Sequence, residues 1–435
     1  MRKLIFLACL VAGCAGESTP ELPDDEQPSG DPDQDTAAAS LATDRGITLD
    51  EAQQRMAWQD KLDDLEDALK AQLGDSFGAL YVDPEKGDRV QVAMTATATA
   101  ADVMAIAQQL GVDAGVDVTR VEHSGAELQE LADKITAELG NTGVAAVDPV
   151  ANVVTITQLT SDRTAVARAL NAYGAAVREG HAIEMEPMAG TTQFNPPSRG
   201  GMLIETTGGV WCTSGFFAHG KSSAHLPYWL LAGHCIPDQD GATWYAKFAN
   251  GTFHELISGL TFQFGGAGDW AIDHAVYNNV WKGKPWVVVQ KGASTSYVPR
   301  YTIKANGMSR VGTRVCHSGA AIGTTCGTIT GVDKIIIYIG TGRAAVGEVT
   351  TNFCTKAGDS GGPVFAAHKA FGILTAGTGK SPHCSGAYEP IQRVEKFLHV
   401  TVDHCIGSGA TTPAADECCS LGADHSRSNQ FLTCE

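Results

Sequence analysis

The segment Gly358-Asp359-Ser360-Gly361-Gly362-Pro363 decides how this chain is interpreted. Glycine tolerates backbone conformations that other residues avoid, so glycines around a serine permit a tight turn that exposes the hydroxyl. A serine hydroxyl becomes a nucleophile only when a neighbouring base takes its proton. The backbone N–H groups of Gly358 and Ser360 are candidates to stabilise an oxyanion beside that hydroxyl. The segment therefore predicts nucleophilic chemistry at Ser360.

Two upstream segments offer the base and the acid that such a serine needs. His234 lies in Leu231-Ala232-Gly233-His234-Cys235, and Asp269 lies in Gly268-Asp269-Trp270-Ala271. Histidine exchanges a proton near neutral pH, and a buried carboxylate fixes its tautomer and stabilises the imidazolium. Asp273, further along the second segment, is a competing acid. The three segments together predict acyl transfer by a His-Asp-Ser arrangement.

In this chain order, the three segments resemble the chymotrypsin-like serine proteases, in particular the secreted bacterial branch of streptogrisins and alpha-lytic protease. The resemblance covers about Gly200 to Val400. It implies an all-β catalytic domain, a double six-stranded barrel closed by a C-terminal helix, which residues 394–400 would supply. It also implies roles: Ser360 attacks, His234 is general base and then acid, and Asp269 orients His234. The glycine-rich approach at residues 264–268 fits this family, and so favours Asp269 over Asp273.

The resemblance also assigns cysteines and a specificity pocket. It implies the disulfides Cys212–Cys235, Cys316–Cys326 and Cys354–Cys384. It implies that substrate is bound by Thr355, Lys356, Ala357, Leu374, Thr375, Ala376 and Gly377. Glutamate-preferring relatives carry histidine where Leu374 stands, and no aspartate marks a trypsin-like pocket base. We therefore expect an apolar or aromatic residue before the cleaved bond.

One position departs from the family. Relatives commonly have arginine where His317 stands, and that arginine can balance the buried aspartate before the nucleophile, here Asp359. A charged His317, or alternatively Arg310 or Arg314, is expected to take over this role. If His317 alone balances Asp359, activity should fall as the pH rises above its pKa.

The N-terminus carries export signals. Arg2-Lys3 precedes an apolar run from Leu4 to Val11, which is typical of a signal peptide. The sequence Val11-Ala12-Gly13-Cys14 that ends it resembles a bacterial lipobox, so we expect residues 1–14 to be a signal peptide with lipidation at Cys14. Ordinary signal cleavage beside an incidental cysteine is the alternative. The protein is expected to be lipid-anchored at the cell envelope before processing, and its catalytic domain released to the medium.

The remaining chain divides by composition. Residues 15–40 are acidic and proline-rich, without lysine or arginine, and predict a disordered tether. Residues 41–187 contain no cysteine and predict a weak repeat of helix, strand, Asp-Pro turn, strand and helix. In that region, Thr48 predicts the start of a helix that runs to Leu73, and Ser124 with Glu127 predicts a capped helix to Leu139. The family resemblance implies that residues 41–187 form an α+β pro region, which aids folding and inhibits the enzyme.

The resemblance places the protease domain at residues 188–404. Proline and glycine clusters between Pro187 and Gly209 predict a linker at its start. A cut near Arg199 or a little upstream would activate it. Residues 405–435 form a tail with Cys405, Cys418, Cys419 and Cys434, whose pairing and role the sequence leaves open.

Composition limits the partners. The chain has 435 residues and a net charge of -18, which argues against binding to nucleic acid. Its hydrophobic content of 43% excludes global disorder. No metal or organic cofactor is implied, and the expected partners are protein or peptide substrates and the pro region. Membrane contact is expected only through the lipid anchor.

Two other functions compete. Gly358-x-Ser360-x-Gly362 also fits the nucleophile elbow of lipases and esterases. In that fold, however, the acid and the histidine follow the serine, and only a short stretch without repeated βα units follows Ser360. A catalytically silent, protease-like surface binding protein is the second alternative. Such proteins usually lack a member of the triad, whereas this chain has all three.

Overall fold

The computed structural model describes most of the chain. The described residues are 32–59, 61–187, 201, 203–206, 210–221, 227–236, 244–247, 253–257, 261–274, 286–290, 297–378, 384–404, 411–412 and 432–433. The predictions for the signal peptide, for Cys14 and for the four tail cysteines lie outside these residues.

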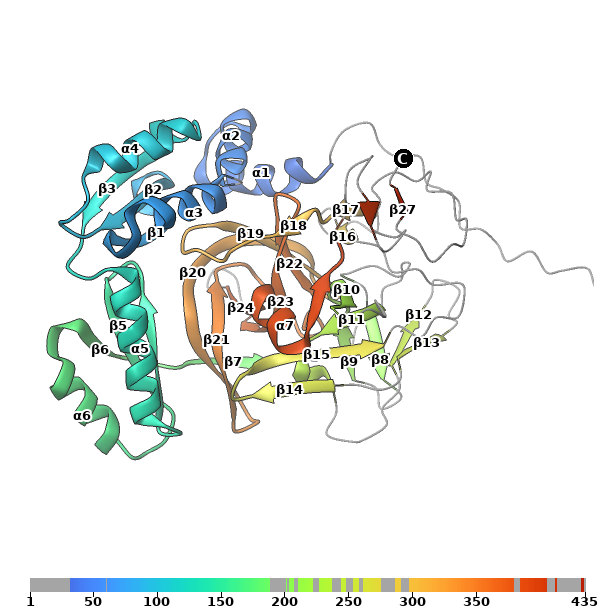
Figure 1. Ribbon diagram of the computed structural model, residues 1–435. Coiled ribbons are helices and arrows are strands. Elements are labelled where there is room, and N and C mark those ends of the chain that lie inside the picture. Colours follow the sequence, from blue (N-terminus) through green and yellow to red (C-terminus); the bar gives the residue numbers. More distant parts are fainter. Residues whose placement is uncertain are drawn as a thin grey trace, which may run out of the picture. The chain divides into compact units, whose positions relative to one another are not determined.

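Two similar α/β lobes make up residues 62–180 (Figure 1). Each has a helix, an antiparallel hairpin, a second helix, and a third strand parallel to the second strand of the hairpin. The first lobe contains α3 (Leu62–Leu73), β1 (Phe77–Asp83), β2 (Arg89–Met94), α4 (Ala100–Gln109) and β3 (Val116–Arg120). The second contains α5 (Gly125–Leu139), β4 (Gly143–Asp148), β5 (Val153–Gln158), α6 (Thr164–Tyr173) and β6 (Val177–Gly180). The repeat predicted from the sequence is therefore present.

Local side-chain bonds explain where these elements turn and start. In the first hairpin the Asp83 carboxylate accepts a hydrogen bond from the N–H of Glu85, and in the second Asp148 accepts from the N–H of Ala151. Aspartate favours turns because its side chain can bond the backbone two or three residues ahead. Ser124 and Glu127 form the predicted capping box at the start of α5. Capping and turn chemistry can thus be recognised in the sequence because both act within a few residues.

Residues 32–40 correct the prediction of a tether. They belong to helix α1 (Pro32–Arg45), in which Ala38 and Leu41 are buried against the core of the β-rich region. Alanine has the highest helix propensity, and the run of alanines at 37–39 lies in the middle of α1. The acidic composition of the segment as a whole obscured this short helix-forming run.

The helix predicted from Thr48 to Leu73 is two helices. The hydroxyl of Thr48 accepts a hydrogen bond from the N–H of Glu51, as predicted, at the start of α2 (Leu49–Gln59). The N–H of Lys61 then donates to the carbonyl of Trp58 at 3.0 Å. Such a bond to the third residue back tightens the end of a helix. The chain restarts as α3.

From Leu203 onward, most described residues lie in strands. These are β8 (Leu203–Thr206), β9 (Trp211–Thr213), β10 (Phe217–Gly220), β11 (Pro227–Leu231), β12 (Trp244–Lys247), β13 (Phe253–Ile257), β14 (Thr261–Gly265), β15 (Gly268–His274), β16 (Trp286–Gln290), β17 (Tyr297–Thr302), β18 (Ala305–Asn306), β19 (Arg314–Gly319), β20 (Gly323–Tyr338), β21 (Arg343–Thr351), β22 (Pro363–Ala366), β23 (Lys369–Thr378), β24 (Ser385–Pro390) and β25 (Val400–Val402). A last pair, β26 (Thr411–Thr412) and β27 (Leu432–Thr433), lies in the tail.

The strands form sheets that enclose one large core. One sheet has the order β14-β15-β11-β10-β25, and another has the order β13-β12-β8-β9. The largest has the order β18-β23-β22-β19-β20-β21-β24, and β7 (Ile183–Pro187) joins it by pairing with β20 and β23. The short helix α7 (Ile391–Leu398) buries Ile391 and Val394 in the core. The predicted helix at 394–400 ends earlier, because His399 takes the left-handed conformation and Val400 starts β25.

Candidate active site

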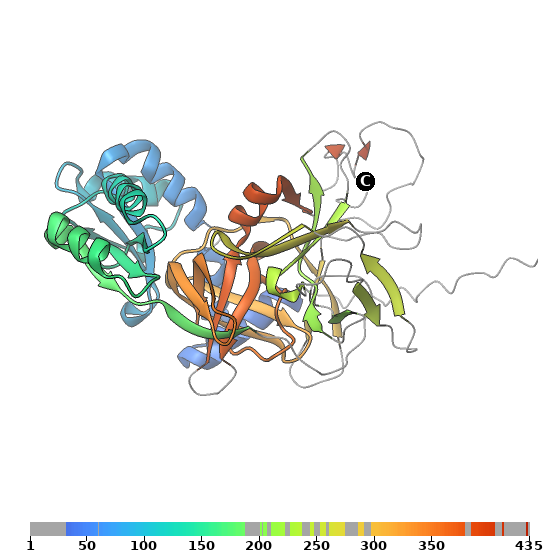
Figure 2. The same ribbon diagram turned by 90° about the horizontal axis from the view of Figure 1, so that it is seen from below.

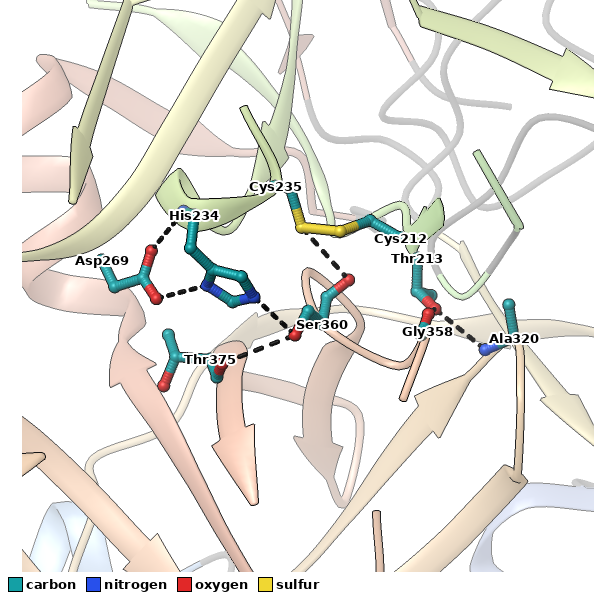
Figure 3. The surroundings of a disulfide bond; sticks show 9 residues. All are labelled: Cys212, Thr213, His234, Cys235, Asp269, Ala320, Gly358, Ser360 and Thr375. Atoms are coloured by element: carbon teal, nitrogen blue, oxygen red, sulfur yellow. Dashed lines mark hydrogen bonds and ion pairs between the residues drawn. A yellow bond between two sulfur atoms is a disulfide. The ribbon is translucent and has the colours of Figure 1, made fainter. Parts of the chain in front are cut away.

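Three side chains from separate elements form one hydrogen-bonded chain (Figure 3). The Nδ1 atom of His234 lies 2.6 Å from Oδ2 of Asp269, and its Nε2 atom lies 2.7 Å from Oγ of Ser360. Asp269 and Ser360 are fully buried. The structure thus brings together the three residues singled out in the sequence. Asp269 is the carboxylate that contacts His234, while Asp273 pairs with Trp229 along the ladder of β15 and β11.

Backbone contacts hold His234 against Asp269. His234 lies on a single 3₁₀ turn, Gly233–Cys235, directly after β11, and Asp269 lies on the neighbouring strand β15. The N–H of His234 donates to Oδ1 of Asp269 at 2.8 Å, so both carboxylate oxygens bind the same residue. A Cβ atom at Gly233 would overlap the carbonyl of Gln263. Glycine therefore permits the close approach that sets this geometry.

Thr213 anchors the loop before Ser360. Gly358 has φ +104°, a conformation that favours glycine. The Thr213 hydroxyl donates to the carbonyl of Gly358 at 2.7 Å and accepts from the N–H of Ala320 at 2.9 Å, and both bonds are buried (Figure 3). The N–H of Thr213 also donates to the carbonyl of Ser360 at 2.7 Å. One threonine therefore fixes the backbone on both sides of Asp359, where the oxyanion donors were predicted.

All three expected disulfides are present. Cys212–Cys235 ties the turn of His234 to β9, Cys316–Cys326 crosses the β19–β20 hairpin, and Cys354–Cys384 connects the segment before Ser360 with the start of β24. The first of these lies beside the hydrogen-bonded chain in Figure 3.

Comparison with known proteins decides the family. The profile of the family described as Trypsin matches residues 226–398. Serine protease 2 of Streptomyces fradiae is 31% identical over 180 residues, which are 41% of this chain and 94% of that protein. The chain belongs to the trypsin family of chymotrypsin-like serine proteases. Streptogrisin-D of Streptomyces griseus is 30% identical over 61% of this chain and 62% of its own length. Among solved structures, Thermobifida fusca protease A is 22% identical, with 48% of this chain and 98% of that chain covered and a TM-score of 0.38.

Membership of this family confirms the predicted fold and enzyme class. The protein is a serine endopeptidase with a chymotrypsin-like, strand-rich catalytic domain, and its substrates are proteins or peptides. Of the helices that the structure describes, none is long and apolar enough to cross a membrane.

The predicted specificity residues of the protease lie on two segments beside Ser360. Leu374, Thr375, Ala376 and Gly377 are buried on β23, and Oγ of Ser360 lies 3.4 Å from the carbonyl oxygen of Thr375. On the other segment Thr355 is fully buried, whereas Lys356 and Ala357 are exposed. A Cβ atom at Gly377 would overlap the Thr355 hydroxyl, so glycine is required there. The buried residues of the two segments are all uncharged.

Asp359 of the protease is bound by backbone N–H groups rather than by a cation. Its carboxylate accepts hydrogen bonds from the N–H groups of Ala321, Ile322 and Lys356 at 2.9, 3.1 and 2.6 Å. His317 is fully buried, and its Nε2 atom is bonded to the carbonyl of Cys354 at 2.9 Å. Burial lowers the pKa of His317, against the smaller opposing influence of the Asp359 charge. The imidazole of His317 is therefore favoured in its neutral form. The contacts do not favour the charged His317 expected from the sequence.

The two alternative cations lie elsewhere. Arg310 forms ion pairs with Asp63 and Glu66 of α3, and Arg314 forms one with Asp44 of α1. Both arginines are almost fully buried by these contacts. They therefore connect the N-terminal helices to the protease domain instead of balancing Asp359.

Two buried glutamates close to Asp269 were missed in the sequence. Glu389 on β24 accepts a hydrogen bond from the N–H of Asp269 at 3.2 Å, and its other oxygen pairs with Nε of Arg393 at 2.9 Å. Glu348 on β21 accepts from the hydroxyl of Thr375 at 2.8 Å. Burial raises the pKa of Glu389 to about 7 and raises that of Glu348 well above its ordinary range. The available signal was a single glutamate in each of the two strands, flanked on both sides by uncharged residues.

Proposed function

We propose that this endopeptidase cleaves peptide bonds with a His234-Asp269-Ser360 triad, through an acyl-enzyme. The observation that carries the proposal is the continuous hydrogen-bonded chain from Asp269 through both nitrogens of His234 to the hydroxyl of Ser360. Oγ of Ser360 attacks the scissile carbonyl carbon, and Nε2 of His234 takes the hydroxyl proton and passes it to the leaving amine. Asp269 keeps the proton of His234 on Nδ1 and stabilises the imidazolium.

The backbone around Gly358 completes the site. The N–H groups of Gly358 and Ser360 would donate to the oxyanion of the tetrahedral intermediate, where preorganised donors contribute most because they need no reorganisation. The anchoring of this loop by Thr213 supports that role. The uncharged residues of β23, with Thr355 opposite, support a preference for an apolar residue before the cleaved bond.

We also propose that the protein is made as an exported proenzyme. The three disulfides support export, because disulfides persist in oxidising compartments. The ion pairs of Arg310 and Arg314, together with the pairing of β7 in the protease sheet, support residues 41–187 as a pro region that docks on the catalytic domain. Lipidation of Cys14 would hold the proenzyme at the envelope. Metabolic labelling with an alkyne fatty acid should mark the wild-type protein but not Cys14→Ala.

Labelling with a fluorophosphonate probe tests the triad. We expect label on the wild-type protein and on Ser76→Ala, a control at a serine far from the site, and none on Ser360→Ala or His234→Ala. Asp269→Asn should react about 10⁴-fold more slowly, because the wrong tautomer of His234 would face Ser360. If the folded wild-type protein takes no label, so that it cannot be distinguished from Ser360→Ala, the result would instead support a catalytically silent binding protein.

A further inference from the structure

Two carboxyl groups are buried together close to Asp269. Strand β15 packs against β21, β23 and β24, and helix α7 packs against β23 and β24 (Figures 1 and 2). Where these elements meet, Glu348 of β21 and Glu389 of β24 are fully buried, and their carboxyl groups are hydrogen-bonded to each other. Two carboxylates this close in a protein interior strongly disfavour each other's charge. One of the two carboxyl groups must therefore hold a proton.

The contacts decide which carboxyl group holds the proton. Glu389 has the partners of a charged group, because Arg393 of α7 forms an ion pair with its Oε1 at 2.9 Å and the N–H of Asp269 donates to its Oε2. Among the described residues, the hydroxyl of Thr375 alone donates to Glu348, at 2.8 Å from its Oε2. A buried carboxylate is costly unless it is paired and hydrogen-bonded. The charge therefore belongs to Glu389 and the proton to Glu348.

Two oxygens without donors agree with this assignment. In the part of the chain that the structure describes, no N–H group and no hydroxyl group donates a hydrogen bond to Oε1 of Glu348 or to Oε1 of Glu389, which Arg393 approaches as an ion pair. Buried polar atoms in native proteins nearly always have a hydrogen-bond partner. A protonated carboxyl group is a donor, so a proton on Glu348 supplies the bond that Glu389 lacks.

The surrounding charges also keep Glu348 neutral. Burial raises its pKa well above the ordinary value of 4.5, and the negative charges of the neighbouring carboxylates, Asp269 among them, raise this pKa further. From β20, the buried Tyr338 adds no cation, and burial raises the pKa of its hydroxyl as well. Lys334 pairs with Glu348 in the β20–β21 ladder, but the carboxyl group whose pKa it lowers is that of Asp333. The charged groups that face Glu348 thus disfavour its ionisation.

The position of Glu348 connects both ends of the hydrogen-bonded chain at the active site. Through Glu389 it reaches the backbone N–H of Asp269. Through the hydroxyl of Thr375 it holds the residue whose carbonyl oxygen lies 3.4 Å from Oγ of Ser360. We propose that Glu348 is kept as a neutral carboxylic acid and that, in this form, it is a positioning residue for Asp269 and Ser360. The inference rests on the triad proposed above.

Replacement of Glu348 tests the positioning role. Glu348→Gln is neutral, accepts from Thr375 and can donate to Glu389, so at pH 7 it should react with the fluorophosphonate probe within about twofold of the wild-type rate. Glu348→Met has a similar length but can do neither, and its rate should fall at least ~10-fold. Equal rates for the two variants would overturn the proposal, because a space-filling residue would tolerate methionine and a required carboxylate would be lost in both.

Infrared difference spectra of the full chain test the proton itself and do not depend on the Met variant. At pH 7 we expect the carbonyl stretch of a buried, protonated carboxylic acid, which Glu348→Gln should remove and Glu389→Gln should keep. The absence of such a band, or a band that follows Glu389 instead, would overturn the assignment. If the wild-type protein takes no fluorophosphonate label, the triad fails together with the positioning role. If it takes label but Glu348→Gln and Glu348→Met react alike, the positioning role alone fails.

Discussion

The backbone N–H of Asp269 donates to the carboxylate of Glu389 at 3.2 Å, and both residues are fully buried. A Cβ atom at Gly268 would overlap that carboxylate, so glycine lets Glu389 reach the backbone. The contact ties β15, which carries Asp269, to β24. Glu389 is therefore a positioning residue for the carboxylate that contacts His234.

Replacement of Glu389 should loosen this arrangement. Glu389→Ala leaves the Asp269 N–H buried without its acceptor, which costs about 1–3 kcal/mol of unfolding free energy. We expect kcat to fall about tenfold with KM nearly unchanged, because the substrate does not touch Glu389. Glu389→Gln keeps an acceptor and should recover most of both losses. Urea unfolding measures the loss of stability, and steady-state kinetics measure the fall in kcat. Equal losses in Glu389→Ala and Glu389→Gln would contradict the positioning role.

Glu348 should make stability depend on pH. Burial raises its pKa in the folded state, so the folded protein binds more protons than the unfolded chain above the ordinary pKa of 4.5. Its contribution to stability is therefore present in acid and is lost as the pH rises through the folded-state pKa. Glu348→Gln cannot ionise, so its unfolding free energy relative to wild type should rise between pH 5 and pH 8. A constant difference across that range in urea titrations would refute this.

Thr213 should affect catalysis without contacting the reacting atoms. Thr213→Val has nearly the same shape but leaves the carbonyl of Gly358 and the N–H of Ala320 unpaired in a buried place. We expect a loss of about 1–3 kcal/mol in stability. We also expect kcat to fall about tenfold, because the N–H groups of Gly358 and Ser360, the proposed oxyanion donors, would be held less rigidly. Thr213→Ser retains the hydroxyl and serves as the matched control. A Val variant as active as the Ser variant would show that the loop needs no anchor.

His317 should not control activity in alkali. Because burial lowers its pKa, the imidazole is already neutral at neutral pH, and Asp359 is held by N–H groups. The activity profiles of wild type and His317→Gln should therefore run parallel from pH 7 to pH 10. The stabilities of the two proteins should differ instead in the acidic range. The wild type loses stability as the pH falls below 6.5, the ordinary pKa of histidine, whereas His317→Gln lacks this loss. If wild-type activity declines in this alkaline range and His317→Gln abolishes the decline, a charged His317 would be supported after all.

Some features of the site and fold could be predicted from the sequence, and others could not. Ser360 and the segments of His234 and Asp269 were found because short motifs carry them, and family resemblance paired the six cysteines. The capped start of α5 was also predicted, since Ser124 and Glu127 act over three residues. The buried role of Arg310 was not, because its partners Asp63 and Glu66 lie on a helix more than two hundred residues earlier. A charged residue in a sequence is normally expected at the surface.

The sequence by itself identified the candidate nucleophile, base and acid, the family, and the repeat in the N-terminal region. These depend on local turn chemistry, helix capping and motif order, which are all contained in short stretches of chain. Only the tertiary structure decided that Glu389 meets Asp269 across 120 residues and that β7 pairs with β23 in one register. The physical reason is that burial and strand pairing are properties of two segments together. The sequence of one segment alone does not reveal which other segment it will contact in the folded protein.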